Sequence, residues 1–252
     1  MDLGLKNKNV LITGSTKGLG KSTAILFAEE GANIIISGRN NDEIQELVKY
    51  ISEKYDVKVF GIQSDLSKEN EAENLFRNSI ELLGSLDILI NNAGVWPKAY
   101  IDNLEKDDFE KTMYLNLEVP YILSRLMIKH LKSEERKGKI INIVSQAAFN
   151  GSTTGHSHYA ASKAGLVTFT KSIAREVAKL GIQVNAVAPG MMRTPMANDA
   201  YMANKEYYDG RIPVGYAAEP EQVGYPILFL ASEKADYITG ITLDVTGGML
   251  MR

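Results

Sequence analysis

The sequence lacks cysteine altogether and contains a single tryptophan among its 252 residues. Without cysteine the chain has no disulfide, no thiolate metal site and no cysteine nucleophile, which is typical of proteins from a reducing compartment. Long apolar runs are missing as well: Tyr225–Ala231 is among the longest, far short of the ~18 residues that a membrane-spanning helix requires. Residues 1–9 have no apolar signal core. We therefore expect a cytoplasmic protein with no membrane partner.

Neither sign of charge dominates, because 28 basic and 31 acidic residues give a formal net charge of −3 at pH 7. A basic stripe of the kind that binds nucleic acid is not indicated, so we expect no nucleic-acid partner. The chain is long enough to bury a substantial core, and it shows no linker, low-complexity tract or internal repeat. We expect one domain over residues 1–252.

What the chain does contain is an alternation of short apolar runs and longer amphipathic stretches. Strands are predicted at about 9–13, 33–37, 58–63, 88–91, 139–145, 183–188 and 241–244. Helices are predicted near 18–30, 42–55, 69–83, 106–132, 157–180 and 219–231. Strand–helix alternation indicates an α/β fold with right-handed crossovers. We therefore expect a doubly wound, Rossmann-like parallel sheet of about seven strands with helices on both faces.

A glycine-rich loop follows the first predicted strand and opens the first predicted helix. It reads Gly14-Ser15-Thr16-Lys17-Gly18-Leu19-Gly20. Glycines in this context let backbone N–H groups approach a pyrophosphate at a helix N-terminus, where the helix dipole favours an anion. The spacing is Gly-x3-Gly-x-Gly rather than the usual Gly-x-Gly-x2-Gly, but the flanking strand and helix are those that a dinucleotide loop requires.

The end of the second predicted strand selects between the two nicotinamide cofactors. An Asp or Glu there would hydrogen-bond the ribose hydroxyls of NAD and repel a 2′-phosphate. The chain instead has Ser37-Gly38-Arg39-Asn40, with no acidic residue before Asp42. Arg39 offers a planar fork that suits a phosphate, and Lys17 adds a second cation, so NADP(H) is favoured over NAD(H).

Asp65 lies just after the third predicted strand. It has two open roles: its carboxylate accepts a hydrogen bond from the adenine amino group, or it caps a turn. The residue types alone do not decide between these two.

Tyr159 and Lys163 lie four residues apart at the start of the helix predicted at 157–180. Residues i and i+4 share one helix face, so the phenol and the ammonium group are expected side by side. A fixed cation favours the phenolate and moves the phenol pKa from about 10 towards neutral pH. The pair therefore indicates acid/base chemistry.

Pro120 falls inside the helix predicted at 106–132, four residues after Asn116. Proline has no N–H and cannot donate to the Asn116 carbonyl oxygen, so we expect the helix to kink there. The freed carbonyl would then accept a hydrogen bond from a water molecule. The alternative that Pro120 makes only a tolerated kink stays open.

The order of several motifs resembles the short-chain dehydrogenase/reductase family. They are the glycine loop, Asn91-Asn92-Ala93-Gly94, Asn116, Ser145 and Tyr159-x3-Lys163. The resemblance runs from Asn9 to about Gly248 and includes Pro189-Gly190 and Thr194. It implies an NADP(H)-dependent oxidoreductase that interconverts a carbonyl and a secondary alcohol by hydride transfer.

The same resemblance implies roles for four residues. Tyr159 would be the general acid/base, and Lys163 would lower its pKa and hydrogen-bond the nicotinamide ribose. Ser145 would orient the substrate oxygen. Asn116 would hold a water molecule that links Lys163 to solvent.

Binding residues follow from the resemblance too. Those implied for the cofactor are Gly14, Ser15, Thr16, Lys17, Gly18, Leu19, Gly20, Arg39, Asp65, Leu66, Asn92, Ala93, Gly94, Tyr159, Lys163, Pro189, Gly190 and Thr194. The candidate substrate contacts are Trp96, Gln146, His156, Met191 and Met192, the last two in a substrate lid at about 191–218. No metal is expected, because the implied mechanism needs none.

One departure from the family pattern is a Ser145–Tyr159 spacing that is one residue longer than is common. The substrate therefore stays open between a 3-oxoacyl thioester or other ketone and a sugar or polyol. A non-catalytic NADP(H)-binding protein is a more distant alternative. Because family members pair helices between subunits, the resemblance implies a homotetramer or homodimer, with the apolar tail 249–252 expected at a second interface.

Overall fold

The computed structural model describes residues 2–152 and 154–252, so Met1 and Thr153 of the predicted domain lie outside the described residues. Its centre is a seven-stranded parallel sheet in the order β3-β2-β1-β4-β5-β6-β7. The strands are β1 (Asn9–Ile12), β2 (Asn33–Gly38), β3 (Val59–Gln63), β4 (Ile88–Asn91), β5 (Gly138–Ile143), β6 (Ile182–Pro189) and β7 (Thr242–Val245). All seven overlap predicted strands, and the predicted doubly wound parallel fold is confirmed.

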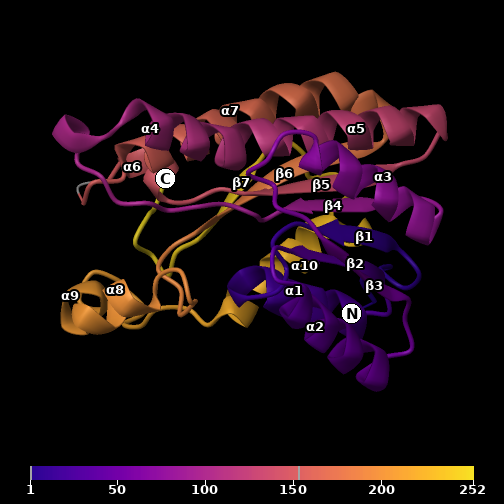
Figure 1. The fold of residues 1–252 in the computed structure, drawn as a ribbon, viewed down its shortest axis with the longest axis horizontal. Coiled ribbons are helices and arrows are strands. Elements are labelled where there is room, and N and C mark those ends of the chain that lie inside the picture. Colours follow the sequence, from indigo (N-terminus) through magenta and orange to yellow (C-terminus); the bar gives the residue numbers. More distant parts are fainter. Residues whose placement is uncertain (1, 153) are drawn as a thin grey trace.

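Helices cover both faces of the sheet, as Figure 1 shows. One face carries α1 (Gly18–Glu29), α2 (Asn41–Lys54) and α10 (Pro220–Ala231). The other carries α3 (Glu71–Leu83), α4 (Lys106–Met113), α5 (Val119–Ser133) and α7 (Ser157–Val177). Short turns complete the chain: η1 (Ile101–Asn103), η2 (Tyr114–Glu118), η3 (Ala178–Leu180) and η4 (Glu233–Ala235). Within the described ranges, no helix combines the length and the apolar character needed to cross a bilayer.

Two cores, one on each face, explain why the strands are apolar throughout. Val10 and Ile12 of β1 pack with α1, α2 and α10, whereas Leu11 packs on the opposite face with α3 and α5. Successive strand side chains point to opposite faces, so a strand that is covered on both sides reads as a continuous apolar run.

The centre of the sheet positions the site. β1 pairs with β2 on one side and with β4 on the other, so the chain reverses its winding direction between β1 and β4. In open parallel sheets the crevice beyond the carboxyl ends of the strands at this point is the usual place for a ligand. The glycine loop after β1 and the loops after β4 and β5 meet there.

The helix predicted at 106–132 is present as an unbroken helical run, although its middle turn is π-helical. The structure has α4, the π-helical turn η2 and α5, with Pro120 in the first turn of α5. The Val119 N–H donates to the Tyr114 carbonyl oxygen, five residues back. Pro120 has no N–H to donate to the preceding turn, and it falls where the helix returns from π to α geometry. The π turn thus directly precedes Pro120, and the predicted kink stays a prediction.

Three short helices were not predicted: α6 (Ala147–Asn150), α8 (Asn198–Ala203) and α9 (Lys205–Asp209). Figure 1 places α8 and α9 to one side of the sheet, apart from the main helical layers. The two ends of segment 191–218 are tied together, because Ala218 N donates to Met191 O at 3.0 Å and Arg193 N donates to Ala218 O at 2.9 Å. Helices this short are marginal by themselves and leave no periodic signal in the sequence.

Candidate active site

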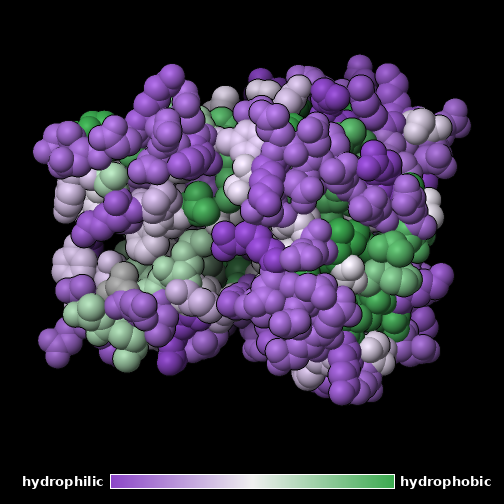
Figure 2. Space-filling model, viewed as in Figure 1, coloured by the Kyte–Doolittle hydropathy of each residue, from purple (hydrophilic) through white to green (hydrophobic). Residues whose placement is uncertain are grey.

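A cleft of about 1090 Å³ opens at the carboxyl ends of the strands and is lined by residues from the loops after β1 to β6. In Figure 2 the surface is hollowed between the part of the chain with α4 and α6 and the part with α8 and α9. This is the position that the winding reversal between β1 and β4 predicts. One continuous hollow therefore contains both the glycine loop and the Tyr159–Lys163 pair.

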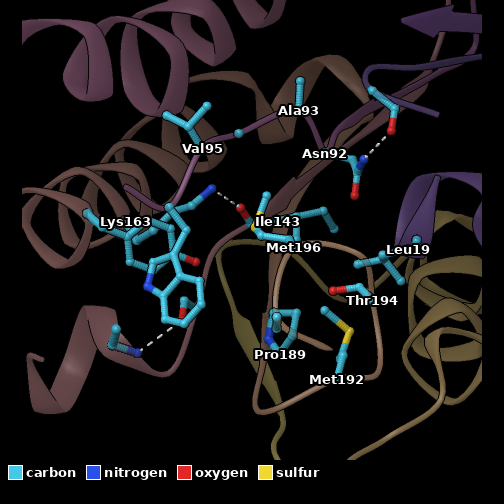
Figure 3. Close-up of a pocket in the computed structure, with 18 of the residues that line it drawn as sticks. Leu19, Asn92, Ala93, Val95, Ile143, Lys163, Pro189, Met192, Thr194 and Met196 are labelled. Carbon is cyan, nitrogen blue, oxygen red and sulfur yellow. Dashed lines mark hydrogen bonds between the residues drawn. The ribbon is translucent and has the colours of Figure 1, made fainter. Parts of the chain in front are cut away.

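The glycine loop is a tight cradle. Gly14 and Gly18 have positive φ angles of 63° and 52°, which favour glycine. A Cβ on Gly20 would lie 2.3 Å from the Gly14 carbonyl oxygen. The side chain of Asn92 holds the loop by donating to Thr13 O at 2.9 Å and Gly14 O at 3.0 Å, one of the contacts drawn in Figure 3.

The N-terminus of α1 points its first N–H groups into this cradle without a side-chain cap from Lys17, the residue before it. Uncapped N–H groups and the helix dipole make such a terminus a site for an anion. The cradle therefore fits the pyrophosphate of a dinucleotide.

Ser145, Tyr159 and Lys163 meet on the other side of the cleft. Ser145 follows the end of β5 and lines the cleft together with Tyr159, and its Oγ accepts from Ala147 N at 3.2 Å. Lys163, one helical turn after Tyr159 on α7, is buried and donates its Nζ proton to the Ile143 carbonyl oxygen at 2.8 Å. Figure 3 shows this bond beside the cleft. The predicted neighbours on the helix face are thus brought to the end of β5.

The charge states differ from the prediction that Lys163 lowers the pKa of Tyr159. Burial raises the pKa of Tyr159, and the hydrogen bond with Ser145 opposes this rise without cancelling it. The Lys163 ammonium is 5.9 Å from the centre of the phenol ring and is engaged with Ile143. Burial also lowers the pKa of Lys163 to about 8. The phenol is therefore protonated at neutral pH.

Asn116 is fully buried and holds two segments together. Its Nδ2 donates to Val95 O at 3.0 Å and Ser162 Oγ at 3.1 Å, and its Oδ1 accepts from Val95 N at 2.9 Å. A Cβ on Gly94 would lie 3.0 Å from Asn116 Oδ1 and 3.5 Å from Lys163 Nζ. Glycine at position 94 thus lets the strand-end loop approach both side chains.

The Asn116 side chain is fully occupied, so any water would be held by its carbonyl oxygen. Across residues 2–152 and 154–252, no donor from outside the helix bonds to that oxygen. This arrangement is compatible with the water-relay prediction, which stays a prediction.

The cations predicted to select the cofactor are both near the cleft, but Lys17 already has a partner. Its Nζ lies 2.8 Å from Glu43 Oε1 on α2. Arg39 is exposed at the end of β2.

Asp65 caps a turn, because its Oδ1 accepts from Ser67 Oγ at 2.7 Å. This bond is the main cause that lowers the pKa of Asp65. The turn-capping role of Asp65, left open by the sequence, is thus present.

Most of the predicted site residues line the cleft. They are Gly14, Thr16, Lys17, Gly18, Leu19, Gly20, Arg39, Asp65, Leu66, Asn92, Ala93, Gly94, Trp96, Ser145, Gln146, Tyr159, Lys163, Pro189, Gly190, Met191, Met192 and Thr194. Figure 3 shows several of them, among them Leu19, Asn92, Pro189 and Thr194, around one hollow.

Three predicted residues do not line it: Ser15, Asn116 and His156. Ser15 is buried towards β2, where its Oγ donates to Ile12 O and accepts from Ser37 N, both at 2.9 Å. The Ser15 hydroxyl is thus occupied by strand backbone, and the predicted cofactor contact of Ser15 stays a prediction that only its backbone would fulfil.

His156 is 5 % exposed and lies behind Trp96, with ring centres 4.3 Å apart and planes at 15°. Its Nδ1 is also 3.0 Å from Thr154 Oγ1. Burial is the main cause that lowers the pKa of His156. His156 therefore supports Trp96, which does line the cleft, and its own substrate contact stays a prediction.

Met249 lines the cleft although sequence reasoning missed it, and Tyr208 and Arg211 of the predicted lid segment 191–218 line it too. The Gln146 Nε2 donates to Met249 Sδ at 3.7 Å, so the chain end meets the loop after β5. Met249 therefore contributes to the cleft within one chain, whereas Met251 is 77 % exposed. Only chain folding brings these positions together, and no local motif in the sequence marks them.

Comparisons with known proteins agree with this geometry. The family described as Enoyl-(Acyl carrier protein) reductase matches residues 14–250. A 3-oxoacyl-(acyl-carrier-protein) reductase of Rickettsia conorii is 39 % identical over 247 residues, 98 % of this chain and 98 % of the relative.

Two solved structures are similar along their whole length. One is described as an NAD(P)-dependent gluconate 5-dehydrogenase of Beutenbergia cavernae with bound NADP; it has a TM-score of 0.92 and 29 % identity, and the match covers 99 % of each chain. The other is a short-chain type dehydrogenase/reductase of Mycobacterium marinum, with a TM-score of 0.93, 27 % identity and coverage of 100 % of this chain and 98 % of that one.

Proposed function

The chain belongs to the short-chain dehydrogenase/reductase family of oxidoreductases, and on that premise we propose that it interconverts a carbonyl and a secondary alcohol with NADP(H). The observation that carries the proposal is the meeting of Ser145, Tyr159 and Lys163 in the same cleft as the glycine cradle. Acid/base groups and a dinucleotide cradle are what such a reaction needs in one place.

The residues of the cleft fit the cofactor. The glycine loop and the N-terminus of α1 would hold the pyrophosphate, Arg39 and Lys17 the 2′-phosphate, and Asn92–Gly94 the adenosine side. Pro189, Gly190 and Thr194 would hold the nicotinamide half, and Lys163 its ribose. When bound, the nicotinamide supplies or accepts the hydride.

Tyr159 would supply the proton. Because burial raises its pKa, the phenol is protonated at neutral pH and suits the role of general acid in carbonyl reduction. Ser145 would donate a hydrogen bond to the same substrate oxygen, stabilising the negative charge that develops there. Lys163 would place a positive charge near the Tyr159 phenol. Asn116 would hold a water molecule through which Tyr159 regains the proton that it gives to the substrate.

The substrate we favour is a 3-oxoacyl thioester or a related ketone, since the relative from R. conorii acts on a 3-oxoacyl group. The second candidate is a sugar or polyol, which the description of the B. cavernae structure favours. Trp96, Gln146, Met191 and Met192 line the side of the cleft where either substrate would lie. We further propose that segment 191–218 is a substrate lid, because its two ends are tied together while α8 and α9 lie beyond the sheet.

A substrate panel tests the proposal. The purified protein is assayed by the near-ultraviolet absorbance of the reduced nicotinamide, against acetoacetyl-CoA, aldoses, gluconate and polyols, each with both cofactors. Turnover of acetoacetyl-CoA with NADPH above all others supports the favoured substrate, and turnover of gluconate or a polyol supports the second. Tight dinucleotide binding with no turnover on any member would favour the non-catalytic alternative.

The assembly and location stay predictions. We propose a homotetramer or homodimer in the cytoplasm, formed as one domain per chain. Light scattering checks the assembly, and a stable monomer would contradict it.

A further inference from the structure

No acidic residue lies at the end of β2, but Glu43 brings a carboxylate to the glycine loop from α2. It lies in the first turn of α2, where its side chain is 28 % exposed. Its Oε1 is 2.8 Å from Lys17 Nζ and accepts from Asn40 Nδ2 at 3.3 Å. A second, smaller hollow that shares Thr16, Lys17 and Gly18 with the main cleft is lined by Glu43.

The groups around the Glu43 carboxylate are those that a 2′-phosphate would need. A Cβ on Gly38 would lie 2.7 Å from Thr16 Cγ2, so the end of β2 and the glycine loop are in contact there. Lys17, aided by Thr16 and Asn40, keeps the pKa of Glu43 below its usual range. The carboxylate is thus ionised at neutral pH and uses part of the positive potential on which the NADP(H) preference depends.

Lys17 and Arg39 are the two cations predicted to hold the 2′-phosphate, and each contributes a charge of +1. Glu43, which pairs with Lys17, contributes −1, so these three residues together carry +1 instead of +2. A 2′-phosphate must therefore share Lys17 with a protein carboxylate and lie close to a like charge. The 2′-hydroxyl of NAD(H) carries no charge, and a carboxylate can accept its hydrogen bond.

We propose that Glu43 is a specificity-determining residue that weakens the preference for NADP(H) and lets the site bind NAD(H) as well. The inference rests on the proposed function, because it assumes that the ribose of the cofactor lies between β2 and the glycine loop. Glu43 would compete with the 2′-phosphate for the Lys17 ammonium group, and this competition would weaken the preference for NADP(H) that Lys17 and Arg39 create.

The test compares Glu43→Gln with Glu46→Gln. Glu46 lines the same small hollow on the same helix, but it has no ion pair in the described part of the chain. Dissociation constants of NADPH, NADH, 2′,5′-ADP and ADP are measured by calorimetry on the whole protein at low and high ionic strength. Thermal unfolding of each variant checks that the fold is retained.

We expect Glu43→Gln to raise the ratio of NADPH affinity to NADH affinity about two- to fivefold, the range for a partly exposed charge pair. The 2′,5′-ADP to ADP ratio should rise in parallel, and high salt should reduce both effects. Glu46→Gln should change neither ratio. A role of Glu43 confined to helix capping would alter the unfolding temperature but leave the ratios unchanged.

An unchanged ratio in Glu43→Gln, with both dinucleotides still bound, would overturn the inference and leave the proposed function intact. Failure of the unaltered protein to bind either dinucleotide would overturn the proposed function and this inference together. Tighter NADPH binding in Lys17→Met than in the unaltered protein would also overturn it, since the cation would then not be what the phosphate and Glu43 compete for.

Discussion

The two ends of the cleft are built by opposite means. At the Tyr159 end, Lys163 and Asn116 are buried and bonded to backbone carbonyl oxygens of other segments. At the Arg39 end, the charged side chains are exposed or half-exposed, and Lys17 makes an ion pair with Glu43. Buried polar groups that are hydrogen-bonded are costly to disturb, whereas exposed pairs contribute little.

This difference separates two tasks. Proton transfer needs fixed geometry, which the buried end provides through bonds between α7, η2 and the ends of β4 and β5. Cofactor choice needs only a balance of charge, which single substitutions on the surface can change. We therefore expect large effects on turnover from changes at the Tyr159 end and small, salt-dependent effects on affinity from changes at the Arg39 end.

Tyr159→Phe should separate turnover from cofactor affinity more clearly than any other substitution. Loss of a general acid lowers turnover by about 10²- to 10⁴-fold, while NADPH affinity should change little because the ring is retained. Steady-state kinetics and a binding titration check the two parts, with Tyr50→Phe on the exposed face of α2 as control. Retained activity, or a parallel loss of NADPH binding, would contradict the assignment of Tyr159.

A pH profile tests the buried charge at the same end. Lys163, with a pKa lowered by burial to about 8, is protonated below that pH and neutral above it. If its charge assists proton delivery, the rate of carbonyl reduction falls about tenfold per pH unit above about 8. Lys163→Arg keeps the charge, since guanidinium does not titrate in this range. An unaltered protein with a flat rate above that pH would contradict the role of the charge.

Packing at the buried end is tested by Gly94→Ala. The added methyl group meets Asn116 Oδ1 at 3.0 Å, and that oxygen is held by Val95 N, so we expect about 1–3 kcal/mol of destabilisation from overpacking and reduced turnover. In the control Gly165→Ala the methyl group meets Leu117 Cδ2 at 3.0 Å, a side-chain end that can move. Thermal unfolding compares the two, and equal effects would mean that Asn116 is not rigidly held.

The smallest effect is expected at the exposed end. Arg39→Gln should weaken NADPH binding by about 1–2 kcal/mol, which corresponds to five- to thirtyfold, because it removes hydrogen bonds from a charged donor. NADH binding should stay nearly the same. A binding titration at low and high salt measures both, and a turnover loss as large as that of Tyr159→Phe would break the contrast between the two ends.

Much of the site could be predicted from the sequence because its motifs are short. The glycine loop and the Tyr159–Lys163 spacing lie within single turns or helices, where local geometry decides which atoms are neighbours. The seven strands could also be predicted from the sequence, since a strand buried on both faces is a continuous apolar run.

Other features depended on neighbours far away in the sequence. Glu43 lies five residues after the end of β2, and its carboxylate contacts Lys17 in the loop after β1. The sequence rule for NAD considers only an acidic residue at the end of the strand, so it does not identify Glu43. The stacking of His156 on Trp96 joins two segments that are far apart in the sequence, so no local pattern indicates it. Helices α8 and α9 are too short to leave a periodic pattern.

The sequence by itself determined the strands, the main helices, the glycine loop and the spacing of the residues proposed for proton transfer, because these depend on periodicity and on residues a few positions apart. The tertiary structure alone decided which side chains face the cleft, and it decided the charge states. Burial raises the Tyr159 pKa and lowers the Lys163 pKa, against the expectation from their spacing. Desolvation depends on every segment packed around a group, and a linear pattern does not contain that information.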